Sequence, residues 1–260
     1  MKSGFGIFLA AFIALGGSWC GFVLAPVHQL GGAQETTVLN STDIYPLPRS
    51  GEGGLGLQVY RANGCAACHT EQVRQTGVAC SVVLADPGKN PVAVTNLISS
   101  LVLTNLTRED AAKVAGKITA AGGKPEIRLG ATGPDIARGW ATRQSVAEDY
   151  LYDLPVQLGN LRAGPDLANV GVRDPDLNWQ LTHLYAPSAI TKGSAMPPFR
   201  YLFELHKIGQ VPSPDALRFP GDFALPPGYE VVPKAEARQL AAYLLSLRAS
   251  VPLYSAPISP

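Results

Sequence analysis

The segment GCAACHT, residues 64–70, constrains this chain more than any other stretch. It contains a Cys-x-x-Cys-His motif, and this spacing is typical of covalent attachment of a c-type haem. Two thiols three positions apart on one helical turn reach the two vinyl groups at one edge of a porphyrin. The histidine that follows is then held beneath the ring, beside the iron. We therefore predict one covalent haem c on Cys65 and Cys68, with His69 as an iron ligand.

Other sites share part of this pattern. A Cys-x-x-Cys pair also occurs in redox dithiols and in zinc sites. A redox dithiol gives no reason for a histidine directly after the second cysteine. A zinc site needs a second pair of ligands, and the remaining candidates show no paired spacing: Cys20, Cys80, His28, His183 and His206. Of the two further cysteines, Cys20 lies in an apolar segment and Cys80 is predicted to be a buried free thiol.

The composition narrows the class of protein. Charged residues make up 16% of the chain, against about 25% in an average soluble protein. The mean hydropathy is +0.10 and the net charge is +1. Without a basic run or patch, nothing indicates a nucleic-acid partner. The 27 glycines and 22 prolines predict a loop-rich domain, as expected where a chain wraps a cofactor.

The N-terminal segment predicts a membrane anchor. No charged residue occurs from Ser3 to Gln34, and Phe5 to Val27 is almost wholly apolar or small. A helix of this length spans about 35 Å, enough to cross a hydrocarbon core of about 30 Å. Pro26 marks its expected end, and the flanking Lys2 favours a cytoplasmic N-terminus. We predict a single-pass anchor over residues 1–30.

Alternatives to an uncleaved anchor fit less well. A signal peptide would have an unusually long apolar region here, with no clear small-x-small cleavage site after it. Attachment of lipid at Cys20 is disfavoured by the bulky Trp19 before it. Gly16, Gly17 and Gly21 either allow close approach of another helix or simply face lipid.

The remainder divides into a linker, a domain and a tail. Residues 31–55 show little periodicity and are predicted to be a linker, followed by a cytochrome c domain over 56–250 and a tail over 251–260. We expect a helix around 54–64, leading into the Cys-Cys-His motif. An amphipathic pattern over 234–248 predicts a second helix near the end of the domain.

The haem motif does not account for residues 77–138, which we interpret as an insertion. Thr107 is placed to cap a helix, with Asp110 at the capping-box position. Gly122-Gly123 ends this helix, and 125–129 is a possible short strand. The segment is predicted to be a small helix-plus-strand insertion. A docking role and an inert insertion both stay open.

Met196 is the candidate for the second iron ligand. An electron-transfer haem usually has Met or His opposite the first histidine, and the only methionine besides Met1 is Met196. A lone methionine often fills a core, but Pro197-Pro198 fixes the backbone here, which favours ligation. The competitors are His183, which could instead bond to the backbone or to a haem propionate, and His206, which could be a surface residue.

Several ordered blocks together resemble the membrane-anchored monohaem cytochrome c subunit (subunit II) of cbb3-type cytochrome c oxidases. They are the anchor, GCAACHTEQVR (64–74), YDLPVQLGNLRAGPDLANVGVR (152–173), Trp179 with His183-Leu184, and SAMPPFRYL (194–202). In that family the Cys-Cys-His motif attaches one haem c, and the methionine of the Met-Pro loop completes the iron coordination. The resemblance thus implies that Cys65 and Cys68 hold the haem and that His69 and Met196 bind its iron.

The same resemblance implies two supporting residues. The carbonyl of Pro165, in Gly164-Pro165-Asp166, would accept a hydrogen bond from His69 and fix its tautomer. Arg162 would pair with a haem propionate, the alternative being a surface salt bridge.

The expected fold is mainly α: an N-terminal transmembrane helix plus a class I cytochrome c-like domain, loop-rich, with a small helix-plus-strand insertion. The expected function is that of a non-catalytic electron-transfer subunit, which relays single electrons to a haem–copper oxidase catalytic subunit. Other cytochrome c subunits, an electron-donor cytochrome and membrane lipid would be its partners. The resemblance places it in a bacterial inner membrane, with the domain on the periplasmic side. The alternatives are the haem c subunit of a nitric oxide reductase, a tethered electron shuttle and a haem-based sensor.

Overall fold

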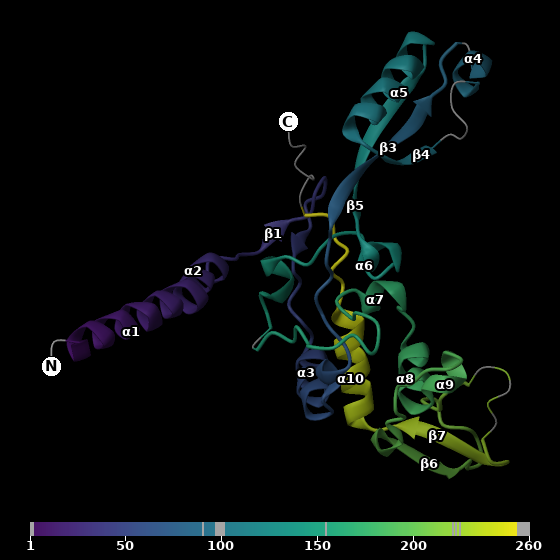
Figure 1. The fold of residues 1–260 in the computed structure, drawn as a ribbon. Helices are drawn as coiled ribbons and strands as arrows, with labels where there is room; N and C mark the ends of the chain where they lie inside the picture. Colours follow the sequence, from purple (N-terminus) through teal and green to yellow (C-terminus); the bar gives the residue numbers. More distant parts are fainter. Residues whose placement is uncertain are drawn as a thin grey trace.

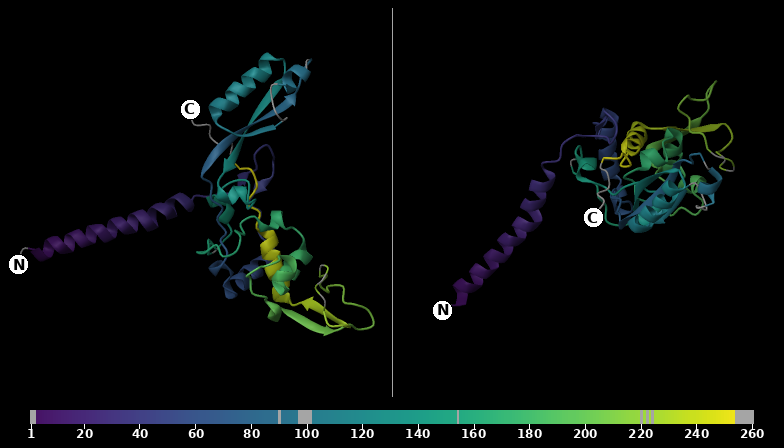
Figure 2. Two further views of the ribbon diagram at one scale, coloured as in Figure 1. Left: turned by 45° about the vertical axis from the view of Figure 1, so that its right-hand side comes forward. Right: turned by 90° about the horizontal axis from the view of Figure 1, so that it is seen from above.

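The computed structural model describes residues 3–89, 91–96, 102–153, 155–219, 221, 223 and 225–253 (Figure 1). Most of the predicted tail, residues 254–260, lies outside these ranges, as does Leu154 in the block 152–173. Helices outweigh strands, at 41% against 16%. Three parts project from the region around α3 and α10: the N-terminal helix, a module that contains β3, β4, β5 and α5, and the hairpin of β6 and β7 (Figures 1 and 2).

The N-terminal segment forms one helical rod of three parts, α1 (Ser3–Trp19), the π-helical turn η1 (Cys20–Leu24) and α2 (Ala25–Leu30). Gly4–His28 is long and apolar enough to cross a membrane. The rod points away from the rest of the chain in every view (Figures 1 and 2). One N-terminal apolar helix thus fits single-pass membrane anchoring.

Pro26 does not end this helix, contrary to expectation. The rod continues to Leu30, with Pro26 in the first turn of α2. The preceding π-turn explains this, because the N–H of Ala25 bonds to the carbonyl of Cys20, five residues back. The hydrogen-bond ladder is already shifted where proline lacks its N–H, so the helix accommodates the ring.

Two helices from opposite ends of the domain pack together, α3 (Gly51–Ala62) and α10 (Ala235–Ser246). The hydroxyl of Ser50 caps α3 by accepting from the N–H of Gly53 at 3.1 Å. The helix predicted around 54–64 is therefore present, but it begins inside the segment expected to be linker. That segment also contains the paired short strands β1 (Thr36–Thr37) and β2 (Ile44–Tyr45).

The predicted amphipathic face of α10 is confirmed by burial. The buried residues of α10 are Ala237, Leu240, Ala241, Tyr243 and Leu244. They join α3 and α8 (Leu177–Tyr185) in the main core, where the rings of Tyr60 and Tyr243 lie 5.1 Å apart. This core is the support beneath the Cys-Cys-His motif, which follows α3 directly. Its assignment to the class I cytochrome c fold stays a prediction.

The insertion contains more strand than expected. Its strands are β3 (Gly77–Asp86), β4 (Val102–Leu106) and β5 (Lys124–Thr132), in the order β4-β3-β5 with antiparallel neighbours. The predicted helix is α5 (Arg108–Ala120), capped by Thr107, and the predicted strand lies within β5. The short helix α4 (Pro91–Thr95) lies between β3 and β4.

The insertion has a hydrophobic core of its own. Its buried members are Cys80, Val82, Val94, Ala111 and Ile118. None of them belongs to the main core. Burial of Cys80 against α5 confirms the predicted free thiol. The strands β3 and β4 were not predicted, because many of their positions are only half-buried and their apolar alternation is weak.

The remaining elements are short. They are η2 (Cys65–Ala67), α6 (Pro134–Ala137), η3 (Ala147–Tyr150), α7 (Val170–Arg173), α9 (Pro187–Ile190), η4 (Arg200–Leu202), β6 (Phe203–Lys207) and β7 (Tyr229–Pro233). Their brevity confirms the loop-rich character that glycine and proline usage predicted.

Close packing of α3 on α10 depends on Gly56. A Cβ at this position would lie 1.9 Å from the carbonyl oxygen of Gln239 and 2.7 Å from Cβ of Tyr243. We expect Gly56→Ala to destabilise the domain by about 1–3 kcal/mol or more, because the helices must separate. Denaturant unfolding of the full chain in mild detergent measures this.

The matched control is Gly54→Ala, on the same helix. Gly54 is exposed and a Cβ there meets nothing within 4 Å. Its replacement should stabilise α3 by about 0.5–1 kcal/mol. Equal effects of the two substitutions would contradict the close approach at Gly56.

Candidate haem-binding site

The Cys-Cys-His motif forms a single tight turn at the end of α3. Gly64, with a φ of 66°, turns the chain into the 3₁₀ helix η2. The N–H groups of Cys68 and His69 both bond to the carbonyl of Cys65, at 3.1 and 3.0 Å. The structure therefore brings the two thiols and the imidazole together on one turn.

The two cysteines differ in their surroundings. Cys65 is half-buried against the main core, and Cys68 is exposed. Burial raises the pKa of the Cys65 thiol to about 12. Redox dithiols work through a thiolate of lowered pKa, so this environment is not one that activates a dithiol.

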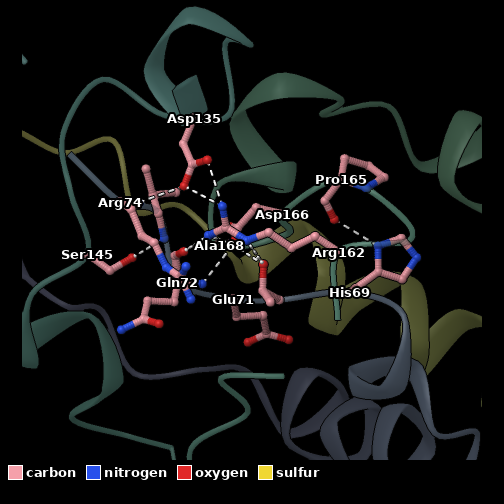
Figure 3. A network of polar contacts seen from close by, with 12 residues as sticks. His69, Glu71, Gln72, Arg74, Asp135, Ser145, Arg162, Pro165, Asp166 and Ala168 are labelled. Atoms are coloured by element: carbon pink, nitrogen blue, oxygen red, sulfur yellow. Dashed lines mark hydrogen bonds and ion pairs between the residues drawn. The ribbon is translucent and has the colours of Figure 1, made fainter. Parts of the chain in front are cut away.

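The imidazole of His69 is oriented by Pro165. Its Nδ1 lies 2.8 Å from the Pro165 carbonyl oxygen (Figure 3). A carbonyl only accepts, so Nδ1 carries the proton and Nε2 keeps a free lone pair. Burial lowers the pKa of His69, although the bond to Pro165 opposes the shift. A neutral imidazole with a free Nε2 is the form that binds a metal ion.

Gly164 makes room for this ring. A Cβ on Gly164 would lie 2.2 Å from Cε1 of His69 and 2.6 Å from its Nδ1. The N–H of Gly164 donates to the carbonyl of Cys68 at 2.9 Å. Only glycine lets the backbone of this loop lie so close beside the imidazole.

The loop before α7 runs alongside the Cys-Cys-His turn through main-chain bonds. Glu71 donates to the carbonyl of Leu158 at 3.1 Å, and Leu167 donates to that of Thr70 at 2.7 Å. Gly159 has a φ of 73°, and a Cβ there would lie 2.1 Å from the carbonyl oxygen of His69. The block 152–173, singled out in the sequence, is thus the structural partner of the motif.

Asp166 fastens this loop to the residues after His69. It is fully buried, and its Oδ2 accepts from the Thr70 hydroxyl at 2.6 Å and from the N–H of Gln72 at 2.8 Å. Its Oδ1 accepts from the N–H of Ala168 at 2.9 Å. Sequence reasoning did not assign it a role, although an aspartate directly after Gly-Pro was a visible signal for side-chain bonds to a turn.

Arg162 lies differently from the expectation. Its guanidinium donates to both carboxylate oxygens of Asp135 at 2.7 and 2.8 Å, and to the carbonyl of Gln72 at 2.6 Å (Figure 3). Its Nε donates to the Thr70 hydroxyl at 3.2 Å. Protein acceptors thus take up most of its N–H groups, and its role as a propionate partner stays a prediction. The pair with Asp135 is also largely buried, so it is no surface salt bridge.

Met196 lies on a loop that packs against the main core, as Cys65 does. It is half-buried, and its N–H donates to the hydroxyl of Ser194 at 3.3 Å. The N–H of Phe199 bonds to the carbonyl of Leu184 at 2.9 Å, which ties the loop to α8. Its role as an iron ligand stays a prediction.

The two competing histidines have distinct surroundings. His183 stacks on Trp179, with ring centroids 4.8 Å apart, and its Nδ1 is buried without a hydrogen-bond partner in the described part of the chain. Burial, and then His69, lower its pKa. His206 is bound to Glu230, Nε2 to Oε1, at 2.9 Å. His206 is therefore occupied by Glu230, whereas His183 has an unsatisfied nitrogen.

A buried carboxyl, Glu71, lies behind the motif. The hydroxyl of Tyr243 donates to it at 2.9 and 3.0 Å, and burial raises its pKa to about 7. It also borders a cavity of about 510 Å³ between residues 38–49, 149–153 and 246–251. This cavity includes none of the predicted site residues.

Within the described ranges, no group of three or more His, Cys, Asp or Glu side chains could hold a metal ion. The zinc alternative therefore finds no ligand set there. A haem differs, because its porphyrin supplies four of the iron's ligands and the protein supplies only the axial ones.

Asp166 should contribute measurably to the stability of the site. In Asp166→Asn an amide NH₂ replaces one acceptor oxygen and leaves at least one buried donor unpaired. We expect a loss of about 1–3 kcal/mol in the free energy of unfolding. Denaturant titration of the full chain in mild detergent measures it.

Asp174→Asn is the matched control. Asp174 is only partly buried and pairs with the adjacent Arg173 at 3.2 Å. Its replacement should change stability by no more than about 0.5 kcal/mol. Equal losses in both variants would show that the bonds of Asp166 are not special.

Comparison with known proteins agrees with the sequence blocks. No curated protein matches the chain. The family model described as cytochrome C oxidase, mono-heme subunit/FixO matches residues 132–214. This range includes Arg162, Pro165 and Met196 but begins after the Cys-Cys-His motif, which it does not cover. The match confirms, over these residues, the resemblance to the monohaem cytochrome subunit of cbb3-type oxidases.

Proposed function

We propose that this chain is the electron-transfer subunit of a terminal haem–copper oxidase. It relays single electrons through one covalently bound haem c to the catalytic subunit. The observation that carries the proposal is the 2.8 Å contact between Nδ1 of His69 and the Pro165 carbonyl, which leaves Nε2 free on the turn that bears the two thiols. The family match over 132–214 supports an oxidase-type complex.

The residues present fit a haem c. Cys65 and Cys68 would hold it through thioethers, and Nε2 of His69 with the sulfur of Met196 would hold the iron. The donor set supports this fit, because Nε2 of His69 keeps a free lone pair on the turn that bears the two thiols. When bound, the haem supplies one-electron exchange at its iron.

The protein's own part is positional. The Gly164 backbone and the Pro165 carbonyl fix the plane and tautomer of the imidazole. The stretch from Met196 to Pro198, with its two prolines, limits the freedom of the thioether. Ligands that hardly move between oxidation states suit a relay.

We further propose that the N-terminal helix holds the domain at the periplasmic face of a bacterial inner membrane. Its length and apolar surface support the anchor. The partners would be the haem–copper catalytic subunit, other cytochrome c subunits and an electron-donor cytochrome.

Replacement of Met196 tests the relay. We expect Met196→Ala to lose the low-spin ferric spectrum and to lower the reduction potential, because the sixth ligand is removed. Optical spectra and redox titration of the purified full chain measure both. Met196→His is the control: it should keep a low-spin iron at a lower potential. An unchanged spectrum in Met196→Ala would instead support a haem-based sensor with an open position.

Co-purification tests the complex. Membranes are solubilised in mild detergent, and the chain is purified through a tag after Pro260. We expect a large polytopic haem–copper subunit in equal amount, identified by mass. If that subunit is a nitric oxide reductase, the oxidase assignment is wrong. Recovery of the haem-bearing chain alone would indicate a tethered shuttle.

A further inference from the structure

The contacts of Arg162 connect three separate parts of the chain. Its guanidinium, on the loop before α7, donates to Asp135 at the base of the insertion and to the carbonyl of Gln72 (Figure 3). It also donates to the hydroxyl of Thr70, directly after His69. Its side chain is 22% exposed and that of Asp135 is 4% exposed. A single nitrogen, Nη1, makes both bonds to the carboxylate, while Nη2 and Nε donate to Gln72 and Thr70. Hydrogen bonds between two charged groups are stronger than neutral ones.

Asp135 binds the same stretch a second time. Its Oδ2 accepts from the N–H of Arg74 at 2.8 Å, in addition to the bond from Arg162. Asp135 therefore fixes the stretch after His69 from one side. Asp166 fixes it from the other, since Oδ2 accepts from Thr70 and Gln72 and lies 3.8 Å from Nη2 of Arg162.

Both ends of the hydrogen bond to the imidazole are thereby held. His69 precedes Thr70, and Pro165 precedes Asp166, so the donor and the acceptor each adjoin a residue of this network. Asp135 is buried, and Arg162 is its closest cation, so loss of Arg162 leaves this carboxylate with only the exposed Arg138 at 3.8 Å. A buried carboxylate without a close partner is costly, which favours a movement of the loops. A movement of the Thr70–Gln72 backbone would change how the imidazole faces the Pro165 carbonyl.

We propose that Arg162, held by Asp135, is a positioning residue for His69, so that the base of the insertion supplies a residue on which the haem environment depends. This inference rests on the proposed haem c function. It also gives residues 134–137, at the base of the insertion, a supporting role. This role differs from both a docking role and an inert insertion, the two alternatives that the sequence left open. In metal sites generally, residues that do not touch the metal but orient its ligands tune its properties.

The test uses the full chain purified in mild detergent, with three readouts. A covalent haem stain reports attachment, electron paramagnetic resonance of the ferric form reports the orientation of the axial imidazole, and redox titration gives the midpoint potential. We expect Arg162→Gln to retain attached haem but to change the ferric g-values. We also expect a tenfold change in the ferric-to-ferrous ratio at a fixed potential, a shift of about 59 mV.

Three further variants separate position from charge. Asp135→Asn should change the g-values in the same way as Arg162→Gln, although the two substitutions change the charge in opposite directions. Arg162→Lys keeps the charge but lacks the planar guanidinium, whose three nitrogens donate to Asp135, Gln72 and Thr70. It should therefore also change the g-values. The double variant should resemble either single variant, because the two residues act as one unit.

Arg138→Gln is the matched control. Arg138 lies 3.8 Å from Oδ1 of Asp135. Arg138 and Arg162 both lie over the Trp140 ring. The side chain of Arg138 is 58% exposed, however, and forms no bond to residues 70–72. Its replacement should leave the g-values unchanged.

The proposal is overturned if Arg162→Gln and Asp135→Asn keep the g-values and potential of Arg138→Gln and lose only thermal stability. If Arg162→Gln does not accumulate, Arg162→Lys and Asp135→Asn decide in the same way. If Arg162→Gln and Asp135→Asn shift the midpoint potential in opposite directions but keep the g-values, the two residues act only through their charge. That result would also overturn the proposal. A negative haem stain in the unmodified chain would instead refute the proposed function itself.

Discussion

The bond from His69 to the Pro165 carbonyl is the contact around which the site is arranged. It determines which ring nitrogen is free, and it requires two loops nearly a hundred residues apart in sequence to lie within hydrogen-bonding distance. Gly164 permits that approach, and Asp166 fastens the loops on the side away from the ring. The packing of α3 on α10 at Gly56 then supports the turn from below. Each of these features depends on close backbone contact, which few residues other than glycine allow.

Polar groups around the turn are buried, and nearly all have partners. Asp166, Asp135 and Arg162 form a connected network, and Glu71 binds Tyr243. Buried charges of this kind contribute little net stability when compared with apolar side chains, but they specify one geometry. In a site that holds a ligand in one orientation, that specificity is the useful property. The apolar core alone would not fix the direction of an imidazole.

Local patterns in the sequence predicted the parts that depend on local chemistry. The apolar rod, the helix over α10, the cap at Thr107 and the position of the Cys-Cys-His turn follow from periodicity and from short-range bonds. The sequence did not predict the partners of Arg162, because Asp135 lies 27 positions away and the pairing depends on how the insertion returns to the domain. The strands β3 and β4 were missed for a related reason. Their pairing is non-local, and their faces are only partly covered.

The separate core of the insertion has a consequence for its dynamics. The buried residues of the outer part pack among themselves: Cys80, Val82, Val94, Ala111 and Ile118. The base of the insertion, at Ile136, instead joins a cluster with Val73, Ala168 and Ala249 of the domain. Regions with distinct cores open as distinct cooperative units. The outer sheet and helix can therefore open transiently while the base stays closed. Substitutions in the outer part of the insertion would then be tolerated more readily than substitutions at its base.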